Sequence, residues 1–207
     1  MINSFALDTN LFFNLQSGLQ WGGSSKEVIE KFNQYATILV QQKKAFFYMT
    51  PNIVDEMKSF FTDEPDYLNA FFTNIIVKSP DSAKGTIGAN VLREFVEETR
   101  NRAYRGMKVA EEEIDVGAKL MMGKDTMSAV DYQKEIGAVI TKFRERFRQA
   151  TRFNFIDSAA DIDLILLARE VDGALVSADE GVMRWGRMIG INEVSPSQFH
   201  ASLEALQ

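Results

Sequence analysis

A long helical stretch inside an otherwise alternating chain most constrains what this sequence can fold into. From about Thr86 to Met122 there is no proline and no strand-like alternation. Apolar residues recur there at roughly helical intervals, at Val91, Phe95, Ala103, Ala110, Ile114 and Leu120. A break at Gly123 and a second helix to about Ala150 predict an αα-hairpin. At 1.5 Å per residue its first helix is about 50 Å long, so we expect the hairpin to project from a core as a spike.

Both flanks of this stretch alternate between short apolar strands and amphipathic helices. Strands are predicted at 5–7, 45–50, 74–79, 173–177 and 191–194, and helices at 26–42, 66–73, 158–171 and 180–189, with others starting at Pro51 and Pro196. The helix that starts at Pro51 is predicted to bury a stripe made of Ile53, Val54, Met57, Phe60 and Phe61. The alternation of strands and helices favours a parallel sheet covered by helices. We therefore predict a three-layer α/β/α fold, with a core of residues 1–85 and 152–207 and a helical hairpin inserted at 86–151.

The residue types present exclude several kinds of site. The 207 residues include no cysteine, which excludes disulfides, thiolate zinc sites and cysteine nucleophiles. The one histidine, His200, lies near the C-terminus and is interpreted as a surface or helix-end residue, so a histidine base is not expected. No apolar run reaches the roughly 18 residues of a membrane span, and no basic, apolar leader precedes the first strand. We expect a soluble cytoplasmic protein without a membrane partner.

Carboxylates lie where the predicted strands end and where a helix begins. Asp8 follows the first strand, and Asp179 follows the strand GALVS. Asp157 and Asp161 are four residues apart at a helix start, so they share one face. Glu56 lies in the first two turns of its own helix and is expected to face the same cleft. Because open α/β sheets bind ligands at the carboxyl ends of their strands, we expect these acids to converge.

Several carboxylates in one cleft repel each other at neutral pH unless a cation or raised pKa values stabilise them. Oxygen ligands without sulfur or imidazole favour Mg²⁺ or Mn²⁺, and a pair of such ions is suited to hydrolysis of a phosphodiester. The alternative is that the acids are helix caps, above all Asp157 and Asp179. Asp163 is expected to point elsewhere, to solvent.

Four segments resemble the motifs of PIN-domain nucleases: LDTN at 7–10, Glu56, FIDSAADIDLILLA at 155–168 and LVSADEGV at 175–182. A PIN core interrupted by a long two-helix hairpin is similar to the HARP family, the small protein-only RNase P enzymes of some bacteria and archaea. SADEGVMRWGRMIGI at 177–191 is the most specific part, and the resemblance covers essentially the whole chain.

The resemblance implies a function and a set of roles. Asp8, Asp157, Asp161 and Asp179 match acids expected to hold the catalytic metals, and Glu56 matches the second acidic position of PIN domains generally. The implied activity is removal of the 5′ leader from precursor tRNA, leaving a 5′-phosphate on the tRNA and a 3′-hydroxyl on the leader. Relatives form a large homo-oligomer, a ring- or star-like dodecamer, through the helical region, without an RNA subunit.

Basic residues cluster in the hairpin although the net charge is −6. The clusters are Arg100, Arg102, Arg105 and Lys108 in the first helix and Arg144, Arg146, Arg148 and Arg152 in the second. An antiparallel hairpin would bring residues near 100 beside residues near 146, making one basic zone that grips RNA phosphates. The alternative is a solvated helix face with ion pairs to Glu97, Glu98 and Glu145.

Other readings of the whole chain stay open. One is a PIN-fold ribonuclease with another RNA target, which the helical insertion disfavours. Another is a non-catalytic RNA-binding or assembly partner of an RNA ligase, which the intact acidic set disfavours. Apolar stripes on both hairpin helices, with methionines 107, 121, 122 and 127, exceed what one hairpin buries. Exposed apolar surface marks an association site, so we expect self-association through the hairpin.

Overall fold

The computed structural model of this chain describes residues 3–16, 19–63, 65–81, 83, 85–124, 126–156 and 158–207. The chain divides into two compact units, one of Met1–Ile87 with Ile156–Gln207 and one of Gly88–Phe155. The elements of the first unit are β1 (Asn3–Leu7), α1 (Asn10–Phe13), α2 (Ser25–Gln41), β2 (Ala45–Met49), α3 (Pro51–Ser59), α4 (Asp66–Thr73), β3 (Ile75–Val77), α7 (Ala159–Glu170), β4 (Ala174–Val176), α8 (Glu180–Ile189), β5 (Glu193–Val194) and α9 (Pro196–Leu206).

The strands form one parallel sheet in the order β3-β2-β1-β4-β5. In register, Leu7 at the end of β1 lies beside Val176 at the end of β4. The residues that follow these two strands therefore meet at one edge of the sheet. The α/β class and the parallel sheet predicted from the sequence are confirmed.

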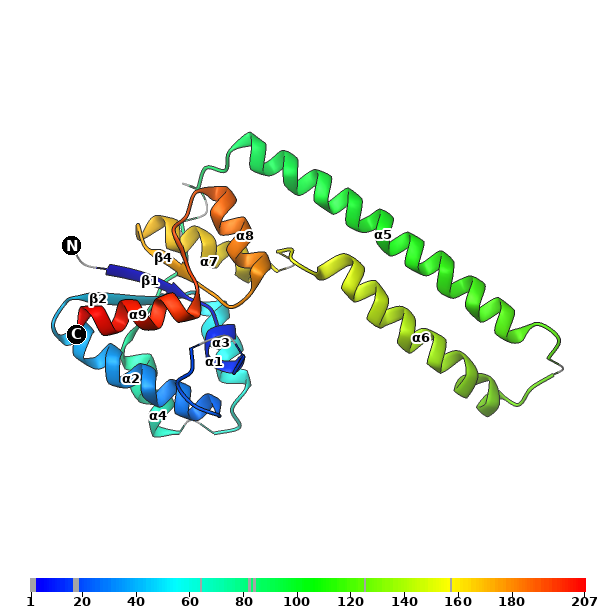
Figure 1. Ribbon diagram of the computed structural model, residues 1–207, viewed down its shortest axis with the longest axis horizontal. Coiled ribbons are helices and arrows are strands. Elements are labelled where there is room, and N and C mark those ends of the chain that lie inside the picture. The colour runs from blue at the N-terminus through cyan, green and yellow to red at the C-terminus, as the bar shows by residue number, and fades with distance from the viewer. Residues whose placement is uncertain are drawn as a thin grey trace. The chain divides into compact units, whose positions relative to one another are not determined.

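An aromatic cluster joins one face of the sheet to its covering helices. Phe5 of β1 and Phe47 of β2 are register partners whose ring centroids lie 5.8 Å apart. Phe32 of α2 and Phe199 of α9 pack edge-on against them, at 5.0 and 5.2 Å. Helix α7 packs on β1 as well, and Figure 1 shows it on the other side of the strands from α2 and α9. The result is a three-layer arrangement in which both faces of β1 are buried.

Local sequence signals explain most helix starts. The Thr50 hydroxyl accepts a hydrogen bond from the Ile53 N–H, and Pro51 occupies the first helical position of α3. One prediction here was wrong. Starting the helix at Pro51 suggested that Phe60 and Phe61 continue its buried stripe, but α3 ends at Ser59 and Phe60 is 57% exposed. The short helix α1 was not expected from the sequence.

The second unit is a pair of helices, α5 (Ala89–Met121) and α6 (Ala129–Arg152), which pack against each other. The 33 residues of α5 make it about 50 Å long. Its buried positions recur every three or four residues, at Arg102, Gly106, Val109, Glu113 and Gly117. Although α5 is long, neither it nor any other helix in the described ranges is apolar enough over a sufficient length to cross a membrane.

Small and charged residues make up most of the buried seam of α5, and of the apolar residues that the periodicity indicated only Val91 is fully buried. Ile114, expected among the recurring apolar positions, is 71% exposed. Gly106 instead allows the helices to approach closely, since a Cβ there would lie 2.7 Å from the ring of Phe147. The apolar stripe of α5 is therefore left partly uncovered within this unit.

An ion pair with a buried carboxylate joins the two helices at a defined register. The Glu113 carboxylate is 3% exposed and lies 2.6 Å from Arg146 and 3.6 Å from Lys142, while Arg146 also pairs with Glu112 at 2.5 Å. Arg146 is thus opposite residues 112 and 113, not beside residues near 100 as the sequence suggested. The hydrogen bond from Arg146, with the charge of Lys142, holds the pKa of Glu113 below its usual range.

Glu113→Gln is expected to lower the melting temperature of the protein near neutral pH, because Lys142 and Arg146 lose the carboxylate that they share and Arg146 keeps only the exposed Glu112. The lowered pKa means that this stabilisation is present above the pKa of Glu113 in the unfolded chain. It is lost as the pH falls through the folded pKa, so the difference between variant and parent should shrink in acid. Far-UV circular dichroism melts would measure this. Glu111→Gln removes only an exposed pair with Lys108 and serves as the control, with little change expected.

Candidate active site

Asp8 is the centre of a hydrogen-bonded cluster at the carboxyl edge of the sheet. It follows β1 directly and is 6% exposed. Ser177 follows β4, and its hydroxyl donates to Asp8 Oδ2 at 2.5 Å because β1 and β4 are neighbours in register. The Asn10 side chain approaches the same oxygen at 3.4 Å. Burial raises the pKa of the Asp8 carboxyl above its ordinary value, against the lowering effect of these hydrogen bonds.

Asp179 is held in the same cluster as the N-cap of α8. Its Oδ1 accepts hydrogen bonds from the N–H groups of Gly181 and Val182, at 2.6 and 3.2 Å. Its own N–H donates to the Ser177 hydroxyl at 2.9 Å. One serine therefore links the backbone of Asp179 to the carboxylate of Asp8. Asp179 can cap α8 and belong to the acidic cluster at the same time, because the cap hydrogen bonds involve its Oδ1 alone.

Asp161 lies in the first turn of α7 and completes the group of acids that the structure describes. Ser158 caps this helix by accepting from the Asp161 N–H at 3.1 Å. Burial raises the pKa of Asp161 to about 6, and the negative charges of Asp8 and Asp179 contribute to the rise. Asp161 therefore lies within electrostatic reach of Asp8 and Asp179.

Glu56 reaches the cluster through a threonine. The buried Thr9 hydroxyl donates to Glu56 Oε2 at 3.0 Å and lies 3.4 Å from Asp8 Oδ1. Glu56 itself is exposed on α3. It therefore lies beside Asp8, as the sequence indicated. Asp163, expected to face solvent, is half-buried on α7.

The described acids offer the type of ligand that a hard divalent cation prefers. All the side chains offer oxygen, and a positive charge would offset both the repulsion and the burial that raise the pKa values of Asp8 and Asp161. Asp157, the remaining predicted ligand, lies outside the described residues. Among the described residues no three acidic or histidine side chains are close enough together to hold a metal by themselves.

Comparison with known proteins decides which family has this arrangement. Residues 4–207 match the family described as PINc domain ribonuclease. The chain belongs to this family. Two relatives named RNA-free ribonuclease P cover it almost completely: one from Pyrococcus furiosus is 34% identical over 98% of this chain and 93% of its own. The other, from Alkalilimnicola ehrlichii, is 33% identical over 98% of this chain and 96% of its own.

A third relative of the same name, from Hyperthermus butylicus, is 32% identical over 100% of this chain and 89% of its own. The HARP resemblance drawn from the sequence is thereby confirmed. As a member of the PINc ribonuclease family the chain is an endoribonuclease. The roles of individual acids remain predictions that the geometry supports.

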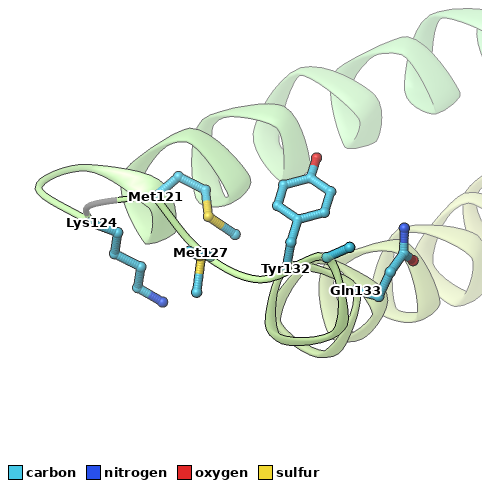
Figure 2. A pocket seen from close by; sticks show the side chains of 6 residues that line it. Met121, Lys124, Met127, Tyr132 and Gln133 are labelled. Atoms are coloured by element: carbon cyan, nitrogen blue, oxygen red, sulfur yellow. The ribbon is translucent and has the colours of Figure 1, made fainter.

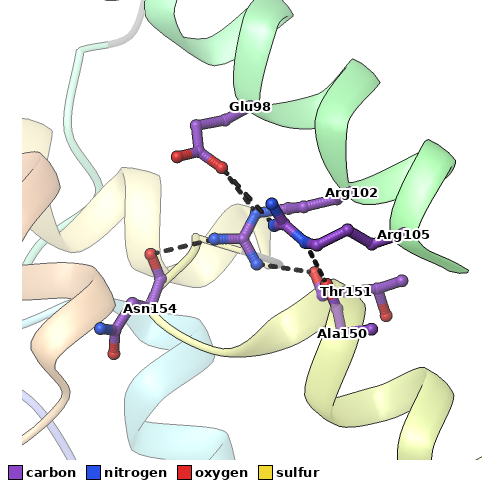
Figure 3. Close-up of polar contacts among 6 residues, drawn as sticks. All are labelled: Glu98, Arg102, Arg105, Ala150, Thr151 and Asn154. Atoms are coloured by element: carbon purple, nitrogen blue, oxygen red, sulfur yellow. Dashed lines mark hydrogen bonds and ion pairs between the residues drawn. The ribbon is translucent and has the colours of Figure 1, made fainter.

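In this PINc ribonuclease, part of the arginine cluster on the hairpin serves to hold the hairpin together. Figure 3 shows the Arg102 side chain pointing from α5 to the end of α6, where it donates to the carbonyls of Thr151 and Asn154 at 3.0 and 3.4 Å. Glu98 pairs with it at 3.3 Å, and its guanidinium lies 4.5 Å from the ring centroid of Phe155. Arg102 is 6% exposed.

The other predicted RNA-binding arginines differ in how far protein contacts occupy them. Arg105 donates to the Ala150 carbonyl at 3.1 Å, and Arg146 is paired with Glu112 and Glu113. Arg152 ends α6. Arg100, Arg144 and Arg148 are exposed. Arg144 and Arg148 are four residues apart, so they share one face of α6.

Two residues of the PINc site, Thr9 and Ser177, were not singled out from the sequence. Each is a small hydroxyl residue, adjacent to Asp8 in one case and two residues before Asp179 in the other. The signal was present in the motifs LDTN and LVSADEGV, but their role depends on which strands pair. Strand pairing places Ser177 against Asp8, and α3 places Glu56 against Thr9.

Asp161→Asn is expected to raise the melting temperature of the metal-free protein by a few degrees near neutral pH. The raised pKa means that the ionised carboxyl disfavours the folded state. This penalty is absent below the unfolded pKa of 3.8, grows as the pH rises from there to about 6, and is fully present above 6. The amide removes that charge and can still bond to Ser158. Thermal melts over a pH series with chelator present would check this. An equal rise in melting temperature at acidic pH would contradict the electrostatic explanation.

Proposed function

We propose that this protein is a metal-dependent RNase P that removes the 5′ leader of precursor tRNA without an RNA subunit. It hydrolyses one phosphodiester, leaving a 5′-phosphate on the tRNA and a 3′-hydroxyl on the leader. The observation that carries the proposal is the Ser177 hydroxyl that links Asp8 to Asp179 at the carboxyl ends of β1 and β4, with Asp161 within electrostatic reach of both. It occurs in a chain that relatives named RNA-free ribonuclease P match over nearly its full length. The substrate, products and metal follow from those relatives and from the acid chemistry.

The chain's own residues position the acids. Asp8, Asp161 and Asp179, with Asp157 from the sequence pattern, would hold Mg²⁺ or Mn²⁺, which supplies an activated water and stabilises the leaving oxygen. Ser177 fixes the rotamer of Asp8 and the backbone of Asp179 at the same time. Thr9 holds Glu56 against Asp8 and keeps a further negative charge at the site. Held rigidly, the oxygens need no rearrangement when a cation or a phosphate arrives.

Cleavage of a labelled precursor tRNA tests the proposal against its alternatives. Purified protein is incubated with 5′-labelled substrate in Mg²⁺, and in parallel with EDTA followed by an excess of Mn²⁺. One cut at the mature 5′ end that EDTA abolishes and Mn²⁺ restores supports the proposal. Scattered cuts would indicate a PIN ribonuclease with another target, and RNA binding without cleavage would indicate a non-catalytic partner.

We also propose that the hairpin joins copies of this chain. Helix α5 and helix α6 leave an apolar groove of about 580 Å³, lined by Ile114, Gly117, Ile136 and Phe143 among others. A second pocket, of about 470 Å³, lies at the turn (Figure 2), where Met121, Met127 and Tyr132 gather. Ile114 and Met122 are 71% and 77% exposed. So much apolar surface on one unit is typical of an association site, and relatives of the HARP family suggest a large closed assembly.

Ile114→Lys is expected to reduce the molecular mass in solution without unfolding the monomer, since the side chain is already exposed within the hairpin. Light scattering coupled to gel filtration measures the mass, and far-UV circular dichroism measures the fold. Asp115→Lys, beside it on α5, is a control for added charge. An unchanged mass for Ile114→Lys would place the interface elsewhere.

A further inference from the structure

An aromatic pair lies one helical turn from the acidic cluster. Thr9 and Glu56 form a contact between the start of α1 and α3, at 3.0 Å. Four residues further along each segment, Phe13 and Phe60 form a second contact, with ring centroids 4.2 Å apart. Both contacts therefore join the same two segments, one helical turn apart. Because one turn of helix advances about 5.4 Å, the Phe13–Phe60 contact lies close to the Thr9–Glu56 contact.

The outer ring of this pair is exposed although it is a large apolar side chain. Phe60 is 57% exposed, while Phe13 is half-buried behind it. Phe61 supports Phe13 from a centroid distance of 5.9 Å. Phe60 thus presents a supported ring to solvent beside carboxylates that act on a phosphodiester. Aromatic rings in this position are typical of single-strand binding surfaces, where a base stacks on the ring without sequence preference.

We propose that Phe60, supported by Phe13, stacks an unpaired nucleobase of the RNA strand next to the cleaved phosphate. The inference rests on the proposed function, because it needs an RNA strand in the cleft. In a precursor tRNA the leader is the strand that is unpaired at the cut, whereas the bases on the other side are paired in a helix. The occupant is therefore a leader nucleotide. The stack would hold the leader in line with Asp8 and would select flexible over paired strands.

The shape of the pair favours a base over a protein side chain as the occupant. The site offers a ring face beside carboxylates. In the proposed function these carboxylates hold a cation that binds the phosphate, which leaves the ring face for the neighbouring base. The ring lies next to the acidic cluster through the contact of Thr9 with Glu56. An RNA strand whose phosphate lies at the acids would therefore also pass the ring. A second copy of the chain seated on Phe60 is the competing occupant, and its mark would be a change of oligomeric mass.

Single-turnover cleavage of substrates with and without a leader base tests this. Two substrates are compared, one with a normal leader and one abasic at the nucleotide before the cut. Phe60→Leu keeps an apolar side chain without a ring, and Phe60→Trp keeps the ring. For the normal leader we expect Phe60→Leu to lower kcat/KM by about tenfold, within the range measured for base–aromatic stacking, and Phe60→Trp to restore it. For the abasic leader all three proteins should be equally slow.

Ile38→Ala is the matched control, since Ile38 is an exposed apolar residue on α2, which contributes none of the site residues. An equal loss for both substrates on Phe60→Leu would overturn the inference and indicate a packing role. A change in light-scattering mass would overturn it in favour of a second copy. If the parent protein itself does not cut precursor tRNA, the proposed function fails. The stack is then judged by whether 2-aminopurine in a single-stranded RNA is quenched less by Phe60→Leu than by the parent, and equal quenching would overturn it.

Discussion

Asp8→Asn is expected to lower the single-turnover rate of leader cleavage by about 10³-fold or more, because bound metal supplies several kcal/mol of transition-state stabilisation. Asp8 connects the cluster, because its carboxylate accepts a hydrogen bond from the Ser177 hydroxyl and lies beside the Thr9 hydroxyl. The amide keeps the size of the side chain and can still accept from Ser177. The melting temperature should therefore stay close to that of the parent or rise, because a buried charge is removed.

Asp172→Asn is the matched control for this variant. Asp172 lies in the turn before β4, at the opposite edge of the sheet from Asp8, and its positive φ of 48° suits asparagine. It should cleave at the parental rate. An Asp8→Asn protein that retains activity while folded would show that the metal is held without Asp8, and the site assignment would be wrong.

Arg144→Ala combined with Arg148→Ala is expected to weaken precursor tRNA binding by about tenfold or more at low salt. These two arginines are exposed and share a face of α6, so one RNA backbone could contact both. The slope of log affinity against log salt should fall by about one for each arginine removed. Filter binding or fluorescence anisotropy in Ca²⁺ over a salt series gives both numbers.

Arg93→Ala is the control for general loss of charge, because Arg93 is exposed on α5 but pairs with Glu97 at 3.0 Å. It should change the affinity and its salt slope much less. Arg102→Ala would be a poor test of RNA binding, since that side chain holds the end of α6 in place. If the double variant binds with parental affinity and slope, the RNA contacts lie elsewhere.

Features that depend on neighbouring residues could be predicted from the sequence, whereas the seam between the two hairpin helices could not. The start of α3 at Thr50-Pro51 and the bounds of α8 followed from caps and periodicity, which act within a few residues. The seam of the hairpin did not, because Gly106 and Glu113 are buried there for reasons of helix spacing and ion pairing across two helices. Apolar periodicity instead indicated Ile114, which is exposed.

The sequence by itself determined the order of strands and helices, the parallel sheet, the hairpin and the positions at which acids follow strands. Only the tertiary structure decided how these acids are held. Ser177 reaches Asp8 because β4 pairs with β1 across 169 residues of sequence, and Glu56 reaches Thr9 because α3 passes α1. Local patterns reflect the period of one element, whereas hydrogen bonds between elements depend on strand order and helix placement. For the same reason the exposed ring of Phe60, read from periodicity as core, became a candidate contact for RNA.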